Sequence, residues 1–231
     1  MSEVKDHILV NGYKHVLYAH KKINAEESIQ NSKDFQQWMD TRRSIREFSN
    51  QSVPKEVIHN ILMSASTAPS GAHKQPWTFC VISNTELKHK IREAAEAEER
   101  ETYANRMSDR WRKDLEPLGT NDVKPFIDIA PYIIVVFKRV YEHDQDDTKH
   151  NNYYVNESIG IASGILITAI HNAGLVTLTH TPSPMNFLTK ILDRPSNERA
   201  YLLLPVGYPE NPVYVPDLKR KPLEDIAVFY E

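Results

Sequence analysis

The sequence is poor in glycine and has one cysteine, and each scarcity excludes a class of site. Only 7 of the 231 residues are glycine, and their scattered positions form neither G-x-G-x-x-G nor G-x-x-x-x-G-K-[ST]. A Rossmann dinucleotide loop and a P-loop are therefore excluded. The lone Cys80 excludes internal disulfides, C-x-x-C redox motifs and iron–sulfur ligation. We expect an intracellular chain in which this cysteine is an inert, buried thiol.

The chain also lacks a surplus of charge and a long apolar run. Its 28 basic and 31 acidic side chains give a net charge of −3, so electrostatics offers no case for nucleic-acid binding. No apolar stretch approaches the roughly 18 residues of a membrane span. The opening MSEVKDHILVNGYKH carries charge where a signal peptide needs its apolar core. We expect a soluble cytoplasmic protein without a membrane or nucleic-acid partner.

Motifs for metal and serine catalysis are absent as well. The 10 histidines form no H-x-x-x-H or H-E-x-x-H pattern, so we expect no metal site. No G-x-S-x-G occurs, which removes the nucleophile-elbow signature of many hydrolases.

Hydrophobic periodicity predicts one α+β domain over residues 34–231, preceded by a polar arm at 1–33. Caps and apolar stripes predict helices from Ser32 to the basic cluster at 41–46, from Ser52 to Pro69, from Asn84 to Arg106, and at 153–173. Strands are predicted at 77–83, 132–138, 175–179 and 201–206. The charged segment 139–152 is expected to be turn-like, and 213–231 to be an extended tail.

Apolar content separates these elements. The helix after Asn84 has strong helix propensity but a thin apolar face, which suits a mobile lid at about 95–125. The helix at 153–173 is apolar on more than one face, so we expect it to be buried centrally or against a partner subunit. Gly174 is expected to end it in the left-handed conformation. The continuous apolar run at 132–138 predicts an interior strand.

Two basic clusters are candidates for holding a phosphate. Arg42-Arg43-Ser44-x-Arg46 and Lys219-Arg220-Lys221 offer guanidinium forks and a hydroxyl, the groups that a phosphate needs when no glycine cradle exists. The ordinary alternative is a basic helix end with a solvated tail, which composition alone favours.

A second candidate site combines a carboxylate, a phenol and an amine. Glu99 and Tyr103 share one helix face at i, i+4, and Lys124 follows a turn-rich stretch. Together they could receive an ammonium group and an aromatic ring. A solvated helix face is the ordinary alternative and is favoured before further evidence.

Longer motifs resemble a known family. They are RRSIREF at 42–48, TAPSGAH at 67–73, QPWTF at 75–79, AGLVT at 173–177, LPVGYP at 204–209 and VPDLKRKPL at 215–223. In this order, and from about residue 34 to the end, they resemble the nitroreductase superfamily of flavoproteins. Within it, the chain is most similar to members that remove halide from halotyrosines.

The resemblance implies a nitroreductase-like FMN-binding fold, with a central, mostly antiparallel sheet flanked by helices. It also implies an interlocked homodimer with exchanged terminal segments and two FMN sites at the subunit interface. By similarity, the FMN contacts are Arg42, Arg43, Ser44, Arg46, Pro69, Ser70, Gly71, Thr179, Thr181 and Arg220. The hydroxyl of Thr181 would face flavin N5, favouring one-electron over hydride chemistry, which makes Thr181 the predicted catalytic residue.

The same resemblance assigns the substrate contacts. Glu99 would pair with the ammonium of a halotyrosine, Lys124 with its carboxylate, and Tyr103 would hydrogen-bond while closing over the ring. The backbone N–H of Ala72 would hold the phenolate oxygen. The expected activity is FMN-dependent reductive dehalogenation of 3-halo-L-tyrosine by single-electron steps, giving tyrosine and halide. NAD(P)H or a reductase would reload the flavin.

Two other functions compete with this one. A broad FMN nitroreductase or quinone reductase would act by hydride transfer on the same fold, and a flavin-storage protein would bind without turnover. Two departures from the family pattern also stand out. Mammalian members carry a membrane anchor where this chain has a short polar arm, and His180 occupies a position where they have a threonine.

Overall fold

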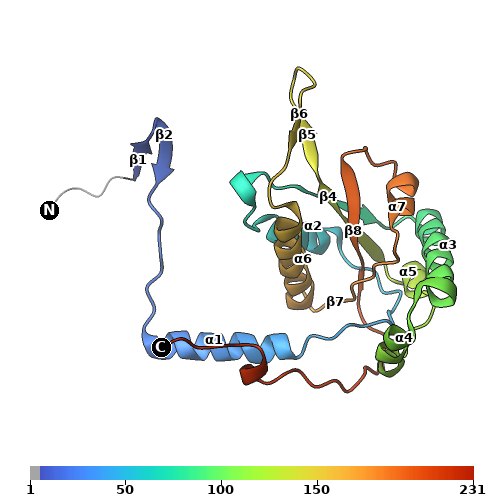
Figure 1. Ribbon diagram of the computed structural model, residues 1–231. Helices are drawn as coiled ribbons and strands as arrows, with labels where there is room; N and C mark the ends of the chain where they lie inside the picture. Colours follow the sequence, from blue (N-terminus) through green and yellow to red (C-terminus); the bar gives the residue numbers. More distant parts are fainter. Residues whose placement is uncertain (1–5) are drawn as a thin grey trace. The chain divides into compact units, whose positions relative to one another are not determined.

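The computed structural model describes residues 6–231, which form two compact units that meet in the sequence between Arg42 and Arg43 (Figure 1). The second unit contains the central sheet and the residues predicted to bind substrate. No helix within the described residues is long and apolar enough to cross a bilayer.

The first unit begins with a β-hairpin that the sequence interpretation missed. Strands β1 (His7–Val10) and β2 (Tyr13–Val16) pair antiparallel. They are joined by Asn11 and Gly12, whose φ angles are 51° and 83°. An Asn-Gly pair with positive φ at both positions favours a tight hairpin turn. The polar arm was predicted because this segment has little hydrophobic periodicity. The Asn-Gly turn nevertheless forms a hairpin there.

The helix of the first unit, α1 (Ala25–Asp40), starts earlier than predicted. Its cap is Asn24, whose side chain accepts the N–H of Glu27 at 2.8 Å. The predicted start at Ser32 is wrong, because that hydroxyl donates to the Ile29 carbonyl inside the helix at 2.8 Å.

The second unit is built on a four-stranded antiparallel sheet in the order β3-β4-β8-β7. The strands are β3 (Trp77–Ile82), β4 (Tyr132–Arg139), β7 (Val176–Thr177) and β8 (Glu198–Gly207). Strand β4 is interior, as its apolar run predicted, and every side chain from Ile133 to Phe137 is fully buried. The predicted antiparallel architecture is therefore confirmed.

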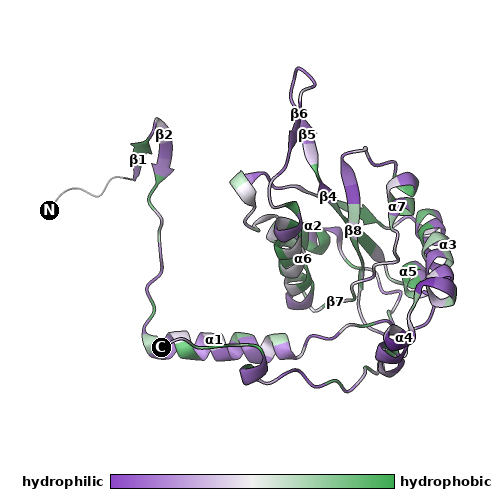
Figure 2. Cartoon of the chain, viewed as in Figure 1, coloured by the Kyte–Doolittle hydropathy of each residue, from purple (hydrophilic) through white to green (hydrophobic). Residues whose placement is uncertain are grey.

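Alternate positions of β4 face two hydrophobic cores, because successive side chains of a strand point to opposite faces. Ile134 and Val136 pack with α2 (Lys55–Ser66) and α6 (Val155–Asn172), while Ile133 and its alternate neighbours pack with three other helices. These are α3 (Thr85–Glu101), α5 (Phe126–Ile129) and α7 (Asn186–Ile191). Figures 1 and 2 show helices on both faces of the sheet, with α6 strongly hydrophobic.

Local capping explains which helix ends were predicted well. Asn84 caps α3 by accepting a backbone N–H at 2.8 Å, and Gly174 follows α6 with φ 70°, both as predicted. Helix α2 starts after Pro54 rather than from a Ser52 cap. The regular part of α3 ends before Arg106, because the chain widens into a π-helical turn at Thr102–Arg106.

Other boundaries were wrong. The segment expected to be turn-like forms the hairpin β5 (Tyr141–His143) and β6 (Lys149–Asn151). Strand β7 is only two residues long, because the chain leaves the sheet after Thr177 and returns only at an isolated bridge between His180 and Leu203. The remaining elements are α4 (Asp109–Leu115) and short 3-10 turns at Gly71–His73, Glu116–Leu118 and Leu223–Asp225.

Candidate active site

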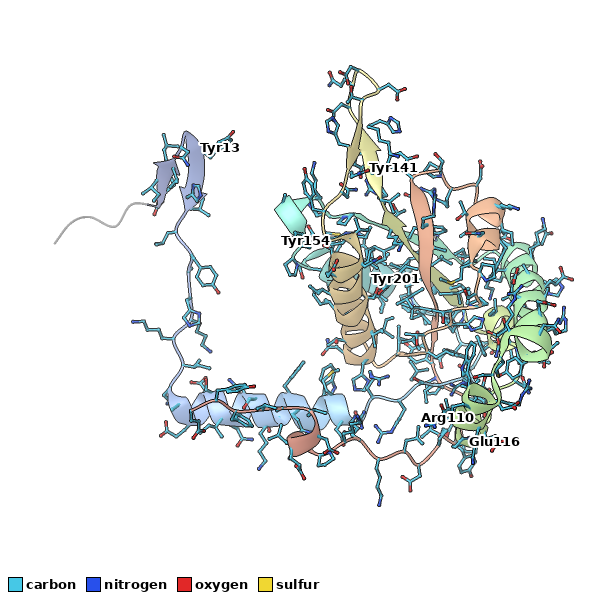
Figure 3. The ribbon with its side chains drawn as sticks, viewed as in Figure 1. Tyr13, Arg110, Glu116, Tyr141, Tyr154 and Tyr201 are labelled. Carbon is cyan, nitrogen blue, oxygen red and sulfur yellow. The ribbon has the colours of Figure 1, made fainter. Side chains whose placement is uncertain are left out.

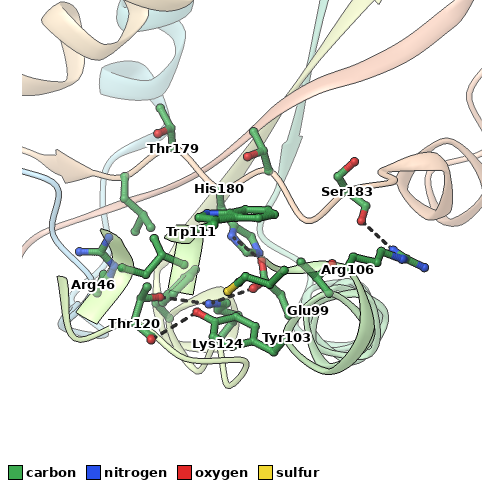
Figure 4. Close-up of a pocket in the computed structure, with 16 residues that line it drawn as sticks. Arg46, Glu99, Tyr103, Arg106, Trp111, Thr120, Lys124, Thr179, His180 and Ser183 are labelled. Atoms are coloured by element: carbon green, nitrogen blue, oxygen red, sulfur yellow. Dashed lines mark hydrogen bonds and ion pairs between the residues drawn. The ribbon is translucent and has the colours of Figure 1, made fainter. Parts of the chain in front are cut away.

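A cavity of about 400 Å³ lies beside the end of α3 (Figure 4). Its walls come from α3 and the π-helical turn, from α4, from the loop before α5, and from the extended segment after β7. The residues from the predicted site that line it are Arg46, Glu99, Tyr103, Lys124, Thr179 and Thr181. Among residues 6–231, no three His, Cys, Asp or Glu side chains are placed to hold a metal ion.

Lys124, which is buried, and Glu99, which is partly buried, form an ion pair in this cavity. The Lys124 Nζ lies 3.5 Å from Oε2 of Glu99, and the two side chains are 5% and 16% exposed respectively. The ammonium also donates to Oγ1 of Thr120 at 3.3 Å and to the carbonyl of Asn121. Burial raises the pKa of Glu99 and lowers the pKa of Lys124, while their mutual attraction opposes both shifts. Each charge is therefore the counter-ion of the other.

Tyr103 reaches the cavity from the π-helical turn. The N–H of Met107 donates to the carbonyl of Thr102 at 2.8 Å, the i+5 bond that defines the turn. Such turns are frequent at functional sites. The Tyr103 hydroxyl donates to the Thr120 carbonyl at 3.3 Å, and burial together with the Glu99 charge raises the pKa of the phenol. Tyr103 is therefore a hydrogen-bond donor at neutral pH.

Two arginines tie this turn to its surroundings. Nη1 of Arg106 donates to the Ser183 carbonyl and to Oε2 of Glu98, both at 3.1 Å. Nη2 of Arg112, on α4, donates to the Tyr103 carbonyl at 2.7 Å. The predicted lid is thus joined to the segment that follows β7.

Side chains alternate along that extended segment. Thr179 and Thr181 are exposed on one side, whereas His180 between them is 6% exposed. Two backbone hydrogen bonds with Leu203, at 2.9 and 3.0 Å, hold His180 against β8. Burial and the nearby cationic side chains lower the pKa of His180 to about 3, so its ring is neutral at physiological pH.

The residues predicted to bind the cofactor phosphate are only partly brought together. Arg46 lines the cavity and also a second one of about 340 Å³, whose wall includes Ser44. An isolated parallel bridge to the end of β7 positions Ser44. Arg43 and Arg220 belong to the same unit but line neither cavity, and Arg42 ends the other unit.

The predicted turn at residues 69–72 also lies outside both cavities. Its backbone is unusual, because Ala72, His73 and Gln75 have φ angles of 48°, 54° and 48°. Residues other than glycine rarely adopt this region. Ser70 fixes the turn by accepting the N–H of Gln75 on its hydroxyl at 2.9 Å. No acceptor for the Ala72 N–H lies within the part of the chain described.

Gly71 is required by a close approach to the start of α6. A Cβ at this position would lie 3.0 Å from both the Tyr153 carbonyl oxygen and the ring of Tyr154, which is labelled in Figure 3. The Gly71 N–H donates to Oγ of Ser158 at 3.4 Å. The turn is therefore fixed on the N-terminal end of α6.

Sequence reasoning missed Arg106, Trp111 and Thr120, all of which line the cavity. Thr120 accepts the Tyr103 hydrogen bond through its carbonyl, which any residue would supply. Trp111 lies on α4, whose cap Ser108 accepts the Trp111 N–H at 3.2 Å. This serine cap was the available signal for a separate helix within the lid.

The antiparallel sheet carries helices on both faces, and the cavity lies beside the end of α3. The nitroreductase family profile matches residues 39–208, and the chain belongs to that family. Within the family, it belongs to the iodotyrosine deiodinases, because the Haliscomenobacter hydrossis iodotyrosine deiodinase is 59% identical over 92% of this chain and 96% of that protein. The resemblance drawn from the motifs is confirmed.

Two further comparisons agree. Human iodotyrosine deiodinase 1 is 46% identical over 93% of this chain and 74% of its own length. A crystal structure of oxidized iodotyrosine deiodinase bound to FMN and 3-iodo-L-tyrosine matches with a TM-score of 0.74 and 30% identity. That match covers 85% of this chain and 98% of the crystal structure's chain, so the predicted fold class is confirmed.

Proposed function

We propose that this protein catalyses FMN-dependent reductive dehalogenation of 3-halo-L-tyrosine by single-electron steps, giving tyrosine and halide. The observation that carries the proposal is that Glu99, Tyr103 and Lys124 meet in one cavity with Thr181. A largely desolvated pair of opposite charges suits the zwitterion of an amino acid, whereas an apolar nitroaromatic needs neither charge. The similar crystal structure contains both FMN and 3-iodo-L-tyrosine.

The residues of the second unit fit a phosphate-bearing flavin. Arg43 and Arg46 with Ser44 offer guanidinium forks and a hydroxyl, the donor set suited to a phosphate. Arg46 lines both cavities, so it can face a ligand that occupies either of them. When bound, FMN supplies the electrons for cleavage of the carbon–halogen bond. The assignments of Arg42 and Arg220 to the same cofactor stay predictions from similarity.

Substrate binding exchanges one ion pair for two. In the free protein, Glu99 and Lys124 neutralise each other at 3.5 Å. The substrate ammonium then pairs with Glu99 and its carboxylate with Lys124, so neither buried charge loses a partner. Tyr103 adds a hydrogen bond, and the lid at about 95–125 closes over the ring and excludes water.

Thr181 and Ala72 act at the aromatic end of the substrate. The Thr181 hydroxyl donates a hydrogen bond toward flavin N5, with Thr179 on the same side of the chain. The Ala72 N–H holds the phenolate oxygen, with Pro69, Ser70 and Gly71 shaping the turn that presents it. Over the reaction, the ring carbon gains one proton and two electrons while halide leaves.

We further propose that the enzyme works as a homodimer. Within one chain, the turn at 69–72 lines neither cavity, although both regions are assigned to one substrate. A two-fold dimer that places the turn of one protomer beside the cavity of its partner accounts for this separation. NAD(P)H or a reductase then reloads the flavin between turnovers.

The deciding experiment compares two substrates on one preparation. Holoenzyme reduced anaerobically with dithionite is mixed with 3-iodotyrosine or with a nitrophenol, and iodide release and nitro reduction are followed. We expect rapid iodide release and slow nitro reduction. Fast nitro reduction without iodide release would support the hydride-transferring nitroreductase instead, and no turnover of either substrate would support a flavin-storage protein.

A further inference from the structure

One ring in the cavity wall has no role in the reaction proposed above. Nδ1 of His180 lies 3.9 Å from Oε1 of Glu99, while Nζ of Lys124 faces the other carboxylate oxygen at 3.5 Å (Figure 4). The second ring nitrogen of His180, Nε2, is buried and has no hydrogen-bond partner among residues 6–231. The two oxygens of Glu99 therefore have different neighbours, one cationic and one an imidazole.

The carboxylate selects the tautomer of this imidazole. A neutral ring carries its proton on one nitrogen only. With the proton on Nδ1, the N–H of His180 faces Oε1 of Glu99; with the proton on Nε2, a nitrogen lone pair would face the carboxylate and repel it. Burial and the charges of Lys124 and Arg46 lower the pKa of His180 to about 3, so the ring is a neutral donor near neutral pH.

Packing does not explain why this position is a histidine. The ring contacts Phe126 edge to face, with centroids 5.7 Å apart, a contact that other side chains can replace. The hydrogen bonds that join His180 to Leu203 use only backbone atoms. The buried Nε2 without a partner costs stability that an apolar side chain of similar size would not. The feature that remains is Nδ1, which faces Glu99.

We propose that His180 is a positioning residue for substrate binding, whose Nδ1–H holds the Glu99 carboxylate once Lys124 has turned to the substrate carboxylate. The inference rests on the proposed function, because only a ligand with a carboxylate of its own draws Lys124 away. As the substrate ammonium enters, the gap of 3.9 Å between Nδ1 and Oε1 closes to a hydrogen bond.

Titratable groups from three segments lie around Glu99. Lys124 and Asp122 come from the loop before α5, Tyr103 from the π-helical turn, and His180 from the segment after β7. Burial raises the pKa of Glu99, Lys124 lowers it and Asp122 raises it. A hydrogen bond from Nδ1 favours the ionised carboxylate. Without it the pKa of Glu99 rises further, and binding of the ammonium is lost at a higher pH.

The test uses three substitutions that differ in where they place a donor. His180→Asn puts its amide nitrogen near the position of Nδ1, His180→Gln puts it near Nε2, and His180→Leu removes it. The dissociation constant of 3-iodotyrosine is measured with oxidised holoenzyme between pH 5 and 8, together with the melting temperature. The phenol of the ligand titrates equally in every variant, so differences on the acidic side report on the protein.

We expect His180→Leu to bind 3-iodotyrosine about tenfold more weakly than the wild type. On the acidic side, its loss of affinity should set in about one pH unit higher. Its melting temperature should equal or exceed that of the wild type. His180→Gln should bind 3-iodotyrosine as weakly as His180→Leu. His180→Asn should restore most of the affinity and the pH dependence of binding seen in the wild type. His150→Leu, in the exposed β5–β6 hairpin, is the control for the same change far from the cavity.

A lower melting temperature for His180→Leu with unchanged binding would assign a purely structural role and overturn the inference. Equal binding by the Asn and Gln variants would overturn it too, and this comparison stands even where the Leu variant fails to fold. The wild-type enzyme separates the two proposals. If the wild-type enzyme releases iodide but the variants bind 3-iodotyrosine alike, only the role of His180 is rejected. If the wild-type enzyme releases no iodide, the proposed function is rejected.

Discussion

Helices α6 and α3 cover opposite faces of one sheet, and they bury different kinds of side chain. Helix α6 buries Ile159, Leu166 and Ile170 completely in an apolar core. Helix α3 buries Ile91 in its middle, but its last turn places the partly buried Glu99 beside the buried Lys124. Apolar burial stabilises a fold without any ligand, whereas a buried ion pair recovers its desolvation cost only partly. Both faces of the sheet therefore carry an apolar core, and the α3 side carries the charged cavity as well.

Two buried lysines on the α3 side sharpen this contrast. Nζ of Lys88 donates to the carbonyls of Asp128 and Ala130, both at 2.7 Å, at the end of α5. These acceptors are fixed backbone atoms. Lys124 also donates to a backbone carbonyl, that of Asn121, but it pairs in addition with the side chain of Glu99, which can turn to another partner. We infer that Lys88 belongs to the framework and Lys124 to the exchangeable part of the site.

The largest effect is expected from a substitution in the apolar core beside α6. Leu166→Ala should lower the free energy of unfolding by about 3 kcal/mol, because it leaves a cavity in a fully buried core. Chemical denaturation of the holoenzyme measures the loss, and the affinity of the folded enzyme for 3-iodotyrosine should stay close to wild type. Lys90→Ala, on the exposed face of α3, is the control and should change stability by less than about 0.5 kcal/mol.

The next largest effect is expected from a substitution in the charged cavity beside α3. Glu99→Gln should weaken 3-iodotyrosine binding about a hundredfold, because it removes the partner of the ammonium and leaves Lys124 as an unpaired buried charge. FMN affinity should be spared. Glu101→Gln, exposed at the end of α3, should bind both ligands normally. Equal losses of FMN and halotyrosine affinity in Glu99→Gln would contradict the assigned role.

A smaller effect separates chemistry from binding within the cavity. Thr181→Ala should lower the ratio of iodide release to nitrophenol reduction about tenfold, because it removes the donor that favours one-electron chemistry. Both rates are measured on one holoenzyme preparation. Thr168→Ala removes a hydroxyl on α6 that donates to the Gly164 carbonyl, and it should leave the ratio unchanged. A wild-type ratio in Thr181→Ala would reject the N5 contact.

The smallest effect concerns the surface bonds of the lid. Arg106→Ala should weaken halotyrosine binding about threefold, since exposed charged contacts contribute little individually. The change should appear mainly as faster dissociation in stopped-flow measurements. Arg110→Ala is the matched control, because Arg110, which is labelled in Figure 3, pairs with Asp114 within α4. Identical dissociation rates in the two variants would show that the contact with Ser183 does not hold the lid.

Features set by neighbouring residues were predictable from the sequence. Asn84 as a cap, Gly174 as a helix end and the interior position of β4 follow from local chemistry or from an apolar run. The side of the cavity built on α3 also followed, because Glu99 and Tyr103 share a face. The hairpin β1–β2 was predictable from Asn11-Gly12 but was missed.

Features set by distant contacts were not predictable in the same way. His180 faces Glu99 only because the chain leaves the sheet after two residues of β7 and then bonds to β8. Trp111 reaches the cavity only because α4 contributes to the same wall as the end of α3. The separation between the turn at 69–72 and the cavity likewise depends on the tertiary fold, and no local pattern encodes it.

The π-helical turn at Thr102–Arg106 determines the directions around the helix axis in which the side chains before and after it point. Each residue of an α-helix advances the chain by about 100° around its axis, so one residue more or less rotates everything downstream by that amount. Deleting Ala104 would convert the i+5 turn toward an i+4 turn. Glu99 would keep its direction, while Arg106 at the end of the turn would rotate away from Glu98 and Ser183. The lid is therefore more sensitive to a change in length here than to most changes of side chain.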